Sequence, residues 1–362
     1  MPANLITALA LGHGAVTFPP PRNAIDRDLA PWNGPVPVDP PSVETHTGWC
    51  PVPGDDGFPS GKNGQACFYF SNGCTIGCDA CDGTSRGPIP SSSDPFWHRK
   101  FNQCPNGTNS TASATICDPA KRTVNTGAAC GADDDWYFYS PWRRPGSAPV
   151  FDSCGLAGGH PPPACKDSCF GGLYVNTSHA SLGDAGSALP RMPAQAVWRA
   201  GELVNVSWVI EANHGGGYIY RLCPADQPLT EECFNKVPLE FEGSQMLRWG
   251  GPQGTTSTFV GTYVGPSGTE PSGAIWARNP IPRNDVGQTG EGFPPPCANT
   301  PGQRCEGMMD GASADPTLEI IDTVRLPKDL APGRWVLGWR WDCEESNQIW
   351  MSCSDVEVVG VA

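Results

Sequence analysis

The strongest constraint on the fold is the alternation of large hydrophobic residues between Arg334 and Trp341. The run reads Arg-Trp-Val-Leu-Gly-Trp-Arg-Trp, so Trp335, Leu337, Trp339 and Trp341 share one face of an extended chain. A period of two is that of a β-strand, whose successive side chains point to opposite faces of a sheet. The segment therefore predicts a strand with one face buried under a second layer.

Further strands follow the same period at 203–210, 218–222 and 349–359. Proline and glycine separate these runs, as in the turn 326–333, and no stretch has helical periodicity of useful length. Short strands separated by turns are typical of sandwiches. The predicted fold is all-β, an immunoglobulin/fibronectin-like antiparallel β-sandwich with long disulfide-stapled loops.

The first half of the chain has a different texture. From His13 to Leu189 it is rich in Cys, Pro, Gly and Asn and has few periodic segments. We expect it to contribute an early strand or two and then to wrap the sandwich with loops. No Ser/Thr-rich or Pro-rich linker separates the halves, so residues 13–362 are predicted to form a single domain.

The cysteines indicate the compartment. Seventeen cysteines suit an oxidising, secretory environment, and four Asn-x-Ser/Thr sequons agree with it. Residues 1–12 are interpreted as a signal peptide, with small residues at Ala10 and Gly12 before a cleavage site. This leader is short and has no positively charged segment, so a truncated gene model is the alternative. We expect a secreted, extracellular protein.

Charge and hydropathy limit the partners. The net charge of −14 argues against nucleic acid, and no apolar run is long enough to span a membrane. An uncharged or weakly basic substrate and a monomeric protein are expected.

The spacing of Cys74, Cys78 and Cys81 allows either a zinc site or disulfides, and the compartment favours disulfides. Cys223 could pair with Cys233, and Cys343 with Cys353.

His13 is a candidate metal ligand because cleavage after Gly12 would make it the N-terminal residue. It would then offer a ring nitrogen and a free α-amine, whereas an interior histidine offers one nitrogen. His214 is the second candidate, in a glycine-rich loop between two predicted strands, where the glycines leave room for a ligand. The alternatives are an ordinary surface residue for His13 and a loop-bonding histidine for His214.

Four ordered motifs resemble the lytic polysaccharide monooxygenases, in particular the chitin-binding type-4 domain group. His13-Gly14 followed by Pro-Pro-Arg-Asn at 20–23 is similar to the family's mature start. The segment 212–223, with Ala212 two residues before His214, is similar to the second-histidine loop. The turn and strand at 326–335 and the closing run Gln-Ile-Trp-Met-Ser-Cys at 348–353 complete the set.

The resemblance implies a copper site. His13 would bind copper through its α-amine and one ring nitrogen, and His214 would supply the third nitrogen, an arrangement that suits Cu(II). Gln348 would face the distal side. Trp350 falls where the family usually has an axial Tyr or Phe, and an indole there can only pack. Trp350 is alternatively an ordinary core residue. Glu344 and Glu345 are further candidates near the copper, although solvated surface carboxylates are the simpler interpretation.

The implied function is a secreted copper monooxygenase that cleaves a β-linked polysaccharide such as chitin or cellulose. An external electron donor, with O2 or H2O2 as co-substrate, is implied with it. One alternative is a non-catalytic module that binds carbohydrate or copper on the same sandwich, because a fold does not secure an activity. Another is a disulfide-rich wall protein that needs neither histidine.

Overall fold

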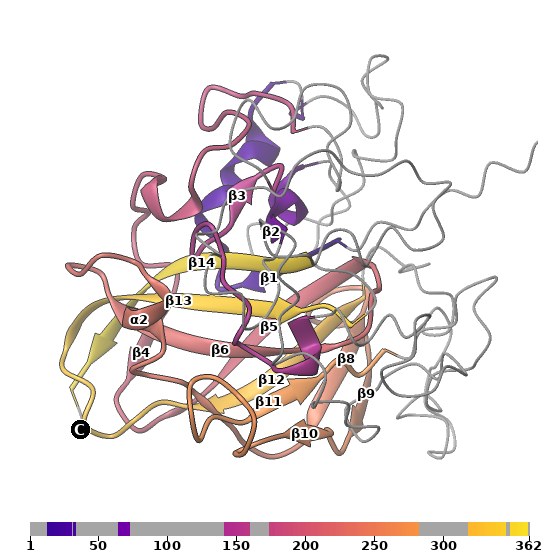
Figure 1. The fold of residues 1–362 in the computed structure, drawn as a ribbon, viewed down its shortest axis with the longest axis vertical. Coiled ribbons are helices and arrows are strands. Elements are labelled where there is room, and N and C mark those ends of the chain that lie inside the picture. Colours follow the sequence, from indigo (N-terminus) through magenta and orange to yellow (C-terminus); the bar gives the residue numbers. More distant parts are fainter. Residues whose placement is uncertain are drawn as a thin grey trace, which may run out of the picture.

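The computed structural model describes residues 13–30, 32–33, 64–72, 141–159, 174–281, 318–344 and 348–360. In these ranges the strands form two sheets that pack face to face (Figure 1). The first sheet has the spatial order β1 (His13–Phe18), β5 (Leu203–Ala212), β12 (Glu319–Arg325), β8 (Gln245–Trp249) and β9 (Thr255–Phe259), with β7 (Glu240–Phe241) beside β12.

The second sheet contains the strand with the alternating tryptophans. Its spatial order is β10 (Tyr263–Val264), β11 (Trp276–Arg278), β6 (Gly217–Pro224), β13 (Gly333–Asp342), β14 (Gln348–Val359), β2 (Tyr69–Asn72) and β3 (Leu156–Ala157). Neighbouring strands are antiparallel, except that β4 (Val197–Arg199) runs parallel to β14. The predicted antiparallel β-sandwich is therefore confirmed.

Helices are few and short in the described residues. The α-helix α2 (Glu231–Phe234) follows β6, and the side chain of Thr230 caps it by accepting a hydrogen bond from the Cys233 backbone. The remaining helical turns are 3-10 turns at Arg22–Asp28, Ala66–Phe68, Pro141–Arg143 and Gly186–Ala188. No described helix is long and apolar enough to cross a membrane.

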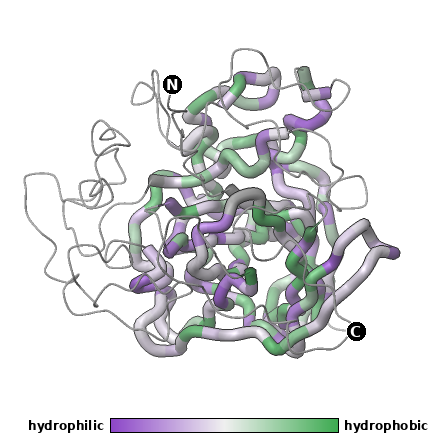
Figure 2. Tube along the Cα trace, turned by 90° about the vertical axis from the view of Figure 1, so that its right-hand side faces the viewer, coloured by the Kyte–Doolittle hydropathy of each residue, from purple (hydrophilic) through white to green (hydrophobic). Residues whose placement is uncertain are grey.

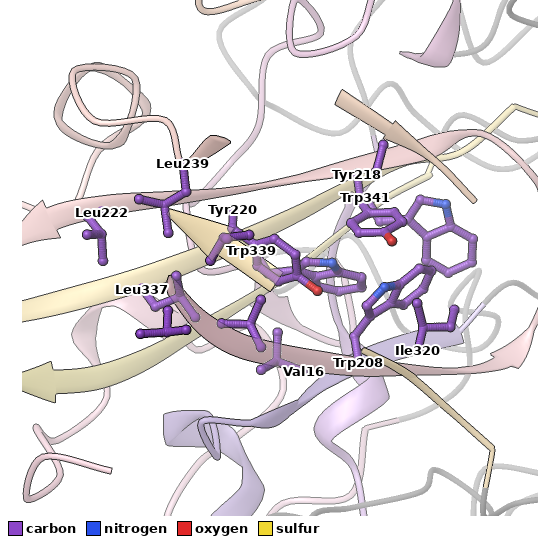
Figure 3. Packing of buried hydrophobic residues seen from close by; sticks show 14 of the residues in the cluster. Val16, Trp208, Tyr218, Tyr220, Leu222, Leu239, Ile320, Leu337, Trp339 and Trp341 are labelled. Atoms are coloured by element: carbon purple, nitrogen blue, oxygen red, sulfur yellow. The ribbon is translucent and has the colours of Figure 1, made fainter. Parts of the chain in front are cut away.

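The core lies between the two sheets and is built on tryptophan. The indole of Trp208, from β5, packs against those of Trp339 and Trp341, with ring centroids 5.1 and 5.3 Å apart (Figure 3). All three side chains are fully buried. Aromatic rings remove the most apolar surface from water per residue, so this layer dominates the burial. The two-residue period at 334–341 is thus confirmed as a buried face.

The strand predictions for 203–210, 218–222, 334–341 and 349–359 are confirmed by β5, β6, β13 and β14. Strand β12 was not predicted, although it lies in the middle of the first sheet. Its pattern is irregular because Ile321 is buried on the face opposite to Ile320, and the polar Asp322 points into the core beside Ile320 and Val324. Because β12 is buried on both faces and has a carboxylate pointing into the core, its sequence does not alternate between hydrophobic and polar residues as a half-buried strand does.

The described part of the first half contributes three strands to the sandwich, where one or two were expected. Strand β1 joins the first sheet, and β2 and β3 join the second. The indigo segments in Figure 1 gather on one side, beside β14, whereas Trp142 of the turn Pro141–Arg143 packs against Trp276 of β11. Hydrophobic and hydrophilic residues alternate along the described part of the chain (Figure 2). Cys74, Cys78 and Cys81 lie outside the described residues.

Among the described residues, two disulfides have both cysteines placed, and both lie on the outer side of the second sheet. Cys223 pairs with Cys233, one of the pairings considered from the sequence. Cys353 pairs with Cys154, across 199 residues, so the Cys343–Cys353 pairing is wrong. On β13, Gly338 is the residue opposite Cys353. Cys343 lies five residues further along, about 16 Å away at the rise of a strand, which is too far for a disulfide.

Candidate metal centre

The start of β1 lies beside the loop that carries His214. Strand β1 pairs antiparallel with β5, and His13 is opposite Ala212. The register shifts between His13 and Gly14, so the strand is irregular at its first residue. Because Ala212 precedes His214 by two residues, the backbone of His13 is adjacent to the His214 loop. The side chains of His13 and Ala212 lie outside the described part of the structure.

The same end of β1 also lies near the start of β14. The Val16 backbone N–H donates to Ser352 Oγ at 3.5 Å, and Ser354 Oγ donates to the Pro19 carbonyl at 2.7 Å. The residue numbers increase together along both segments, from Val16 to Pro19 and from Ser352 to Ser354, so the two segments run in the same direction. Towards their N-terminal ends, the first segment leads to His13 and the second leads to Trp350. The histidine and the family-motif residues of β14 therefore occupy one end of the sandwich.

The His214 loop is a tight turn. His214 is 6% exposed, and its carbonyl accepts a hydrogen bond from the Glu344 backbone at 3.0 Å. Gly216 has a φ of +77°, and a Cβ there would lie 2.0 Å from the carbonyl oxygen of Asp342. Only glycine fits this approach of two backbones. The glycines after His214 therefore pack the loop against the end of β13, whereas the sequence had suggested that they leave space for a ligand.

An asparagine pair fixes the loop on its other side. Asn213 Oδ1 accepts from the Gly215 N–H at 2.9 Å and from Asn279 Nδ2 at 2.8 Å. Asn213 Nδ2 donates to the Ile281 carbonyl at 2.9 Å, and Asn279 Oδ1 accepts from the Ile281 N–H at 2.9 Å. Both side chains are buried. Satisfied buried networks hold a single arrangement, so the backbone on each side of His214 is held in place.

Trp341 contacts both histidine-bearing segments. Its Nε1–H donates to the Gly215 carbonyl at 2.7 Å. Its ring also lies against Gly14, because a Cβ placed on Gly14 would be 3.0 Å from Cζ3. Gly215 and Gly14 each follow one of the two histidines. The sequence marked Trp341 as core only, and nothing in its local pattern indicates this second contact.

The residues predicted from the closing motif are buried. Gln348 begins β14 opposite Asn72 and is fully buried. Trp350 is also fully buried, lies opposite Trp341 on β13, and stacks on Phe70 with centroids 4.4 Å apart. Trp350 is thus a core residue, as the alternative interpretation had it. The distal role of Gln348 and the axial role of Trp350 stay predictions.

The interpretation of Glu344 as a solvated surface carboxylate is wrong. Glu344 is 2% exposed, and its Oε2 accepts from the Gly216 N–H at 3.4 Å. The turn after β13 carries it back over the His214 loop, which buries it. Glu345 lies outside the described residues. Of the other histidines, His179 is structural, because its Nε2 lies 3.0 Å from the Arg22 carbonyl. His46, His98 and His160 lie outside the described ranges.

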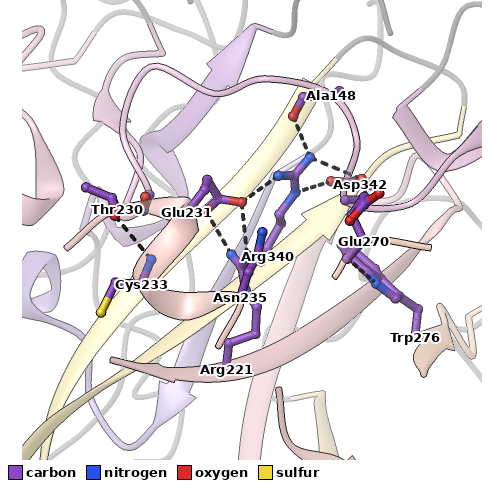
Figure 4. Close-up of polar contacts among 12 residues, drawn as sticks. Ala148, Arg221, Thr230, Glu231, Cys233, Asn235, Glu270, Trp276, Arg340 and Asp342 are labelled. Atoms are coloured by element: carbon purple, nitrogen blue, oxygen red, sulfur yellow. Dashed lines mark hydrogen bonds and ion pairs between the residues drawn. The ribbon is translucent and has the colours of Figure 1, made fainter. Parts of the chain in front are cut away.

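A charged network on the outer face of the second sheet supports the end of β13 (Figure 4). Arg340 donates from Nε to Asp342 at 2.7 Å and from Nη1 to Glu231 at 2.7 Å. Arg221 binds Glu231 with both terminal nitrogens at 2.9 Å. Burial by itself raises the pKa of Glu231, but the two guanidinium groups outweigh it and lower the pKa to about 2. Arg340 and Asp342 flank Trp341, so both faces of β13 are fixed there.

The chemistry of the nearby donors decides which metal this end of the sandwich could hold. No group of three or more His, Cys, Asp or Glu in the described residues could hold a metal ion. What converges at this end of the sandwich is the buried His214 and the backbone of His13. Imidazole and amine nitrogens are ligands that copper accepts readily. If His13 were the N-terminal residue, its amine and imidazole nitrogens would join the His214 imidazole in a donor set that fits a copper ion.

Comparison with known proteins gives partial structural matches. No family model matches the chain, and no curated protein matches its sequence. A lytic polysaccharide monooxygenase from Thermobia domestica in the Cu(I) state matches with a TM-score of 0.23 and 17% identity, over 46% of this chain and 63% of the other. A chitin-binding domain from Burkholderia pseudomallei matches with a TM-score of 0.23 and 14% identity, over 48% and 59%.

A lytic polysaccharide monooxygenase from Streptomyces lividans matches with a TM-score of 0.23 and 11% identity, over 46% of this chain and 59% of the other. In these three matches the chain spans less than two thirds of the length of the protein to which it is similar.

Proposed function

We propose that the chain, from His13 onward, is a secreted copper-dependent lytic polysaccharide monooxygenase that cleaves a β-linked polysaccharide. The observation that carries this proposal is the register of β1, which sets His13 opposite Ala212, two residues from the buried His214. His214 and His13 are the proposed ligands, the latter through its imidazole and its α-amine. The motif that begins at His13 and the motif at 212–223 are about 200 residues apart in the sequence, and their backbones are adjacent where β1 pairs with β5.

Copper bound there would supply one-electron redox chemistry, fed by an external donor and O2 or H2O2, for oxidation next to a glycosidic bond. The role of the protein is to hold the nitrogen ligands in position. The asparagine pair and Glu344 keep the His214 backbone fixed. The His13 amine must lose its proton to bind a metal, so binding should weaken as the pH falls below about 8. Gln348 and Trp350, at the start of β14, are proposed as the further residues that would line the copper site.

A non-catalytic module that binds carbohydrate or copper is the second candidate. The burial of Trp350 against Phe70 favours it, because the residue in the axial place is held by the core. Such a module would bind copper or polysaccharide and release no oxidised products.

Copper binding gives the first test. We expect the chain beginning at His13 to bind one Cu(II), with an electron paramagnetic resonance spectrum typical of three nitrogen ligands. His214→Ala should lose tight binding, because only the two N-terminal nitrogens would remain. His179→Ala is the matched control, since that histidine contacts the Arg22 carbonyl, and it should bind as the wild type does. A chain with one extra residue before His13 should lose the amine ligand.

Product analysis separates the two candidates. Copper-loaded protein is incubated with chitin or cellulose and ascorbate, and the soluble sugars are examined by mass spectrometry. Oxidised oligosaccharides are expected, and the His214→Ala variant should release none. Binding of copper and polysaccharide without such products would favour the non-catalytic module. Binding of one copper by His214→Ala with wild-type affinity would contradict the proposed ligand set.

A further inference from the structure

The indole of Trp341 lies between the two segments that carry the proposed ligands. On one side its Nε1–H donates to the Gly215 carbonyl at 2.7 Å. On the other side the ring is so close to Gly14 that an added Cβ would lie 3.0 Å from Cζ3 and 3.1 Å from Cε3. Gly14 and Gly215 belong to different parts of the sequence, and one flat, fully buried side chain touches both.

The neighbouring Trp339 shows that packing alone does not require this contact. Trp339 lies two residues earlier on the same strand and the same face, and it is also fully buried. Its Nε1–H has no hydrogen-bond partner within the described ranges. Both indoles pack on Trp208, with centroids 5.1 and 5.3 Å away. Trp341 differs from Trp339 by its bond to the His214 loop and its contact with the start of β1.

We propose that Trp341 is the positioning residue that sets the distance between the His13 and His214 segments. The inference rests on the proposed copper function. Trp341 contacts Gly14 and Gly215, which directly follow the proposed ligands His13 and His214. A shift of the indole would therefore move the backbone beside both histidines. Side chains that orient metal ligands without touching the metal commonly control affinity by tenfold or more.

The strand that carries Trp341 is itself held in place. Arg340 and Asp342, its neighbours in sequence, are bonded to each other on the opposite face, and Asp342 Oδ2 accepts from the Gly146 N–H at 2.7 Å. Trp341 is also opposite Tyr218 on β6 and Trp350 on β14. A side chain on a support fixed from both sides is suited to setting a distance.

The test compares Trp341→Phe with Trp339→Phe in the chain beginning at His13. Both substitutions remove one indole from the same strand, and both should lower the melting temperature of the copper-free protein. Trp341→Phe should also raise the Cu(II) dissociation constant about tenfold or more and change the electron paramagnetic resonance spectrum. Trp339→Phe should keep the wild-type spectrum and affinity. Equal effects of the two variants on copper would overturn the inference.

Gly14→Ala tests the same contact from the other side and leaves Trp341 intact. Its methyl group would press on the indole and on the Val209 carbonyl, each 3.0 Å away. We expect the same direction of change in spectrum and affinity, so the inference is testable even if Trp341→Phe does not fold. An unchanged spectrum in Gly14→Ala would count against it. Failure of the wild type to bind copper through three nitrogens would instead overturn the proposed function, and this inference with it.

Discussion

On the outer face of the second sheet, the carboxylate of Glu231 lies between the guanidinium groups of Arg221 and Arg340. Between the sheets, the carboxylate of Asp322 accepts hydrogen bonds from neutral donors in the described part of the chain. Tyr218 and Tyr220 donate to Asp322 at 3.1 and 3.0 Å, and Gln245 Nε2 donates at 2.7 Å.

The pKa values move in opposite directions. Burial raises the pKa of Asp322 to about 6, although the three hydrogen bonds oppose it. Burial also acts on Glu231, but there the cations win and lower the pKa to about 2.

Three hydrogen bonds from neutral donors therefore do not replace a counter-charge at a buried carboxylate. The opposite pKa shifts also make the contributions of the two carboxylates to stability depend on pH in opposite directions. The raised pKa of Asp322 means that its contribution to stability is present below about pH 4 and is lost as the pH rises through 6. The lowered pKa of Glu231 means that its contribution is present above about pH 4.5 and is lost as the pH falls toward 2.

The largest expected effect comes from Arg340→Met. The change removes the cation that Asp342 and Glu231 share while keeping much of the side-chain volume. Leaving the buried Asp342 and the partly buried Glu231 with less compensation should cost about 3 kcal/mol or more in the free energy of unfolding, measured by urea denaturation at pH 7. Arg325→Met, in the exposed pair with Glu242, is the control and should leave the midpoint near that of the wild type. Equal effects would mean that the buried network contributes no more than a surface pair.

Asp322→Asn tests the pH window between the sheets. The variant carries no titrating group there, so it should lack the loss of stability that the wild type shows between pH 4 and pH 8. The difference in unfolding free energy between the two proteins should shrink by up to about 3 kcal/mol across that range, since two units of pKa separate the folded and unfolded carboxyl. Parallel stability curves for the two proteins would show that Asp322 does not titrate there.

Tyr220→Phe should have the smallest effect. It removes one donor to Asp322 and leaves the ring in the core. The pKa of Asp322 should rise further, because the lost hydrogen bond favours the ionised form. Stability should fall by about 1–2 kcal/mol above pH 7 and by less at pH 4, where the carboxyl is protonated. A loss that is the same at both pH values would point to lost packing as the cause.

Much of the sandwich could be predicted because strand periodicity is a local property. Trp339 and Leu337 identify the buried face of β13 from their spacing alone, and the structure confirms it. Strand β12 was missed because Asp322 breaks the pattern, and an inward carboxylate is stable only where Tyr218, Tyr220 and Gln245 meet it from other strands.

In the candidate site, too, some features follow from the local sequence and others from contacts between distant segments. The sequence pattern predicted His214, in its glycine loop, and His13, behind a short leader, as candidate ligands. It could not determine that Gly14 and Gly215 meet at Trp341, nor that Glu344 is buried over the loop. Those contacts join residues far apart in the chain, and they exist only because β1 pairs with β5 while β13 packs beneath both. Local pattern determined which residues are candidates, and strand pairing decided which of them come together.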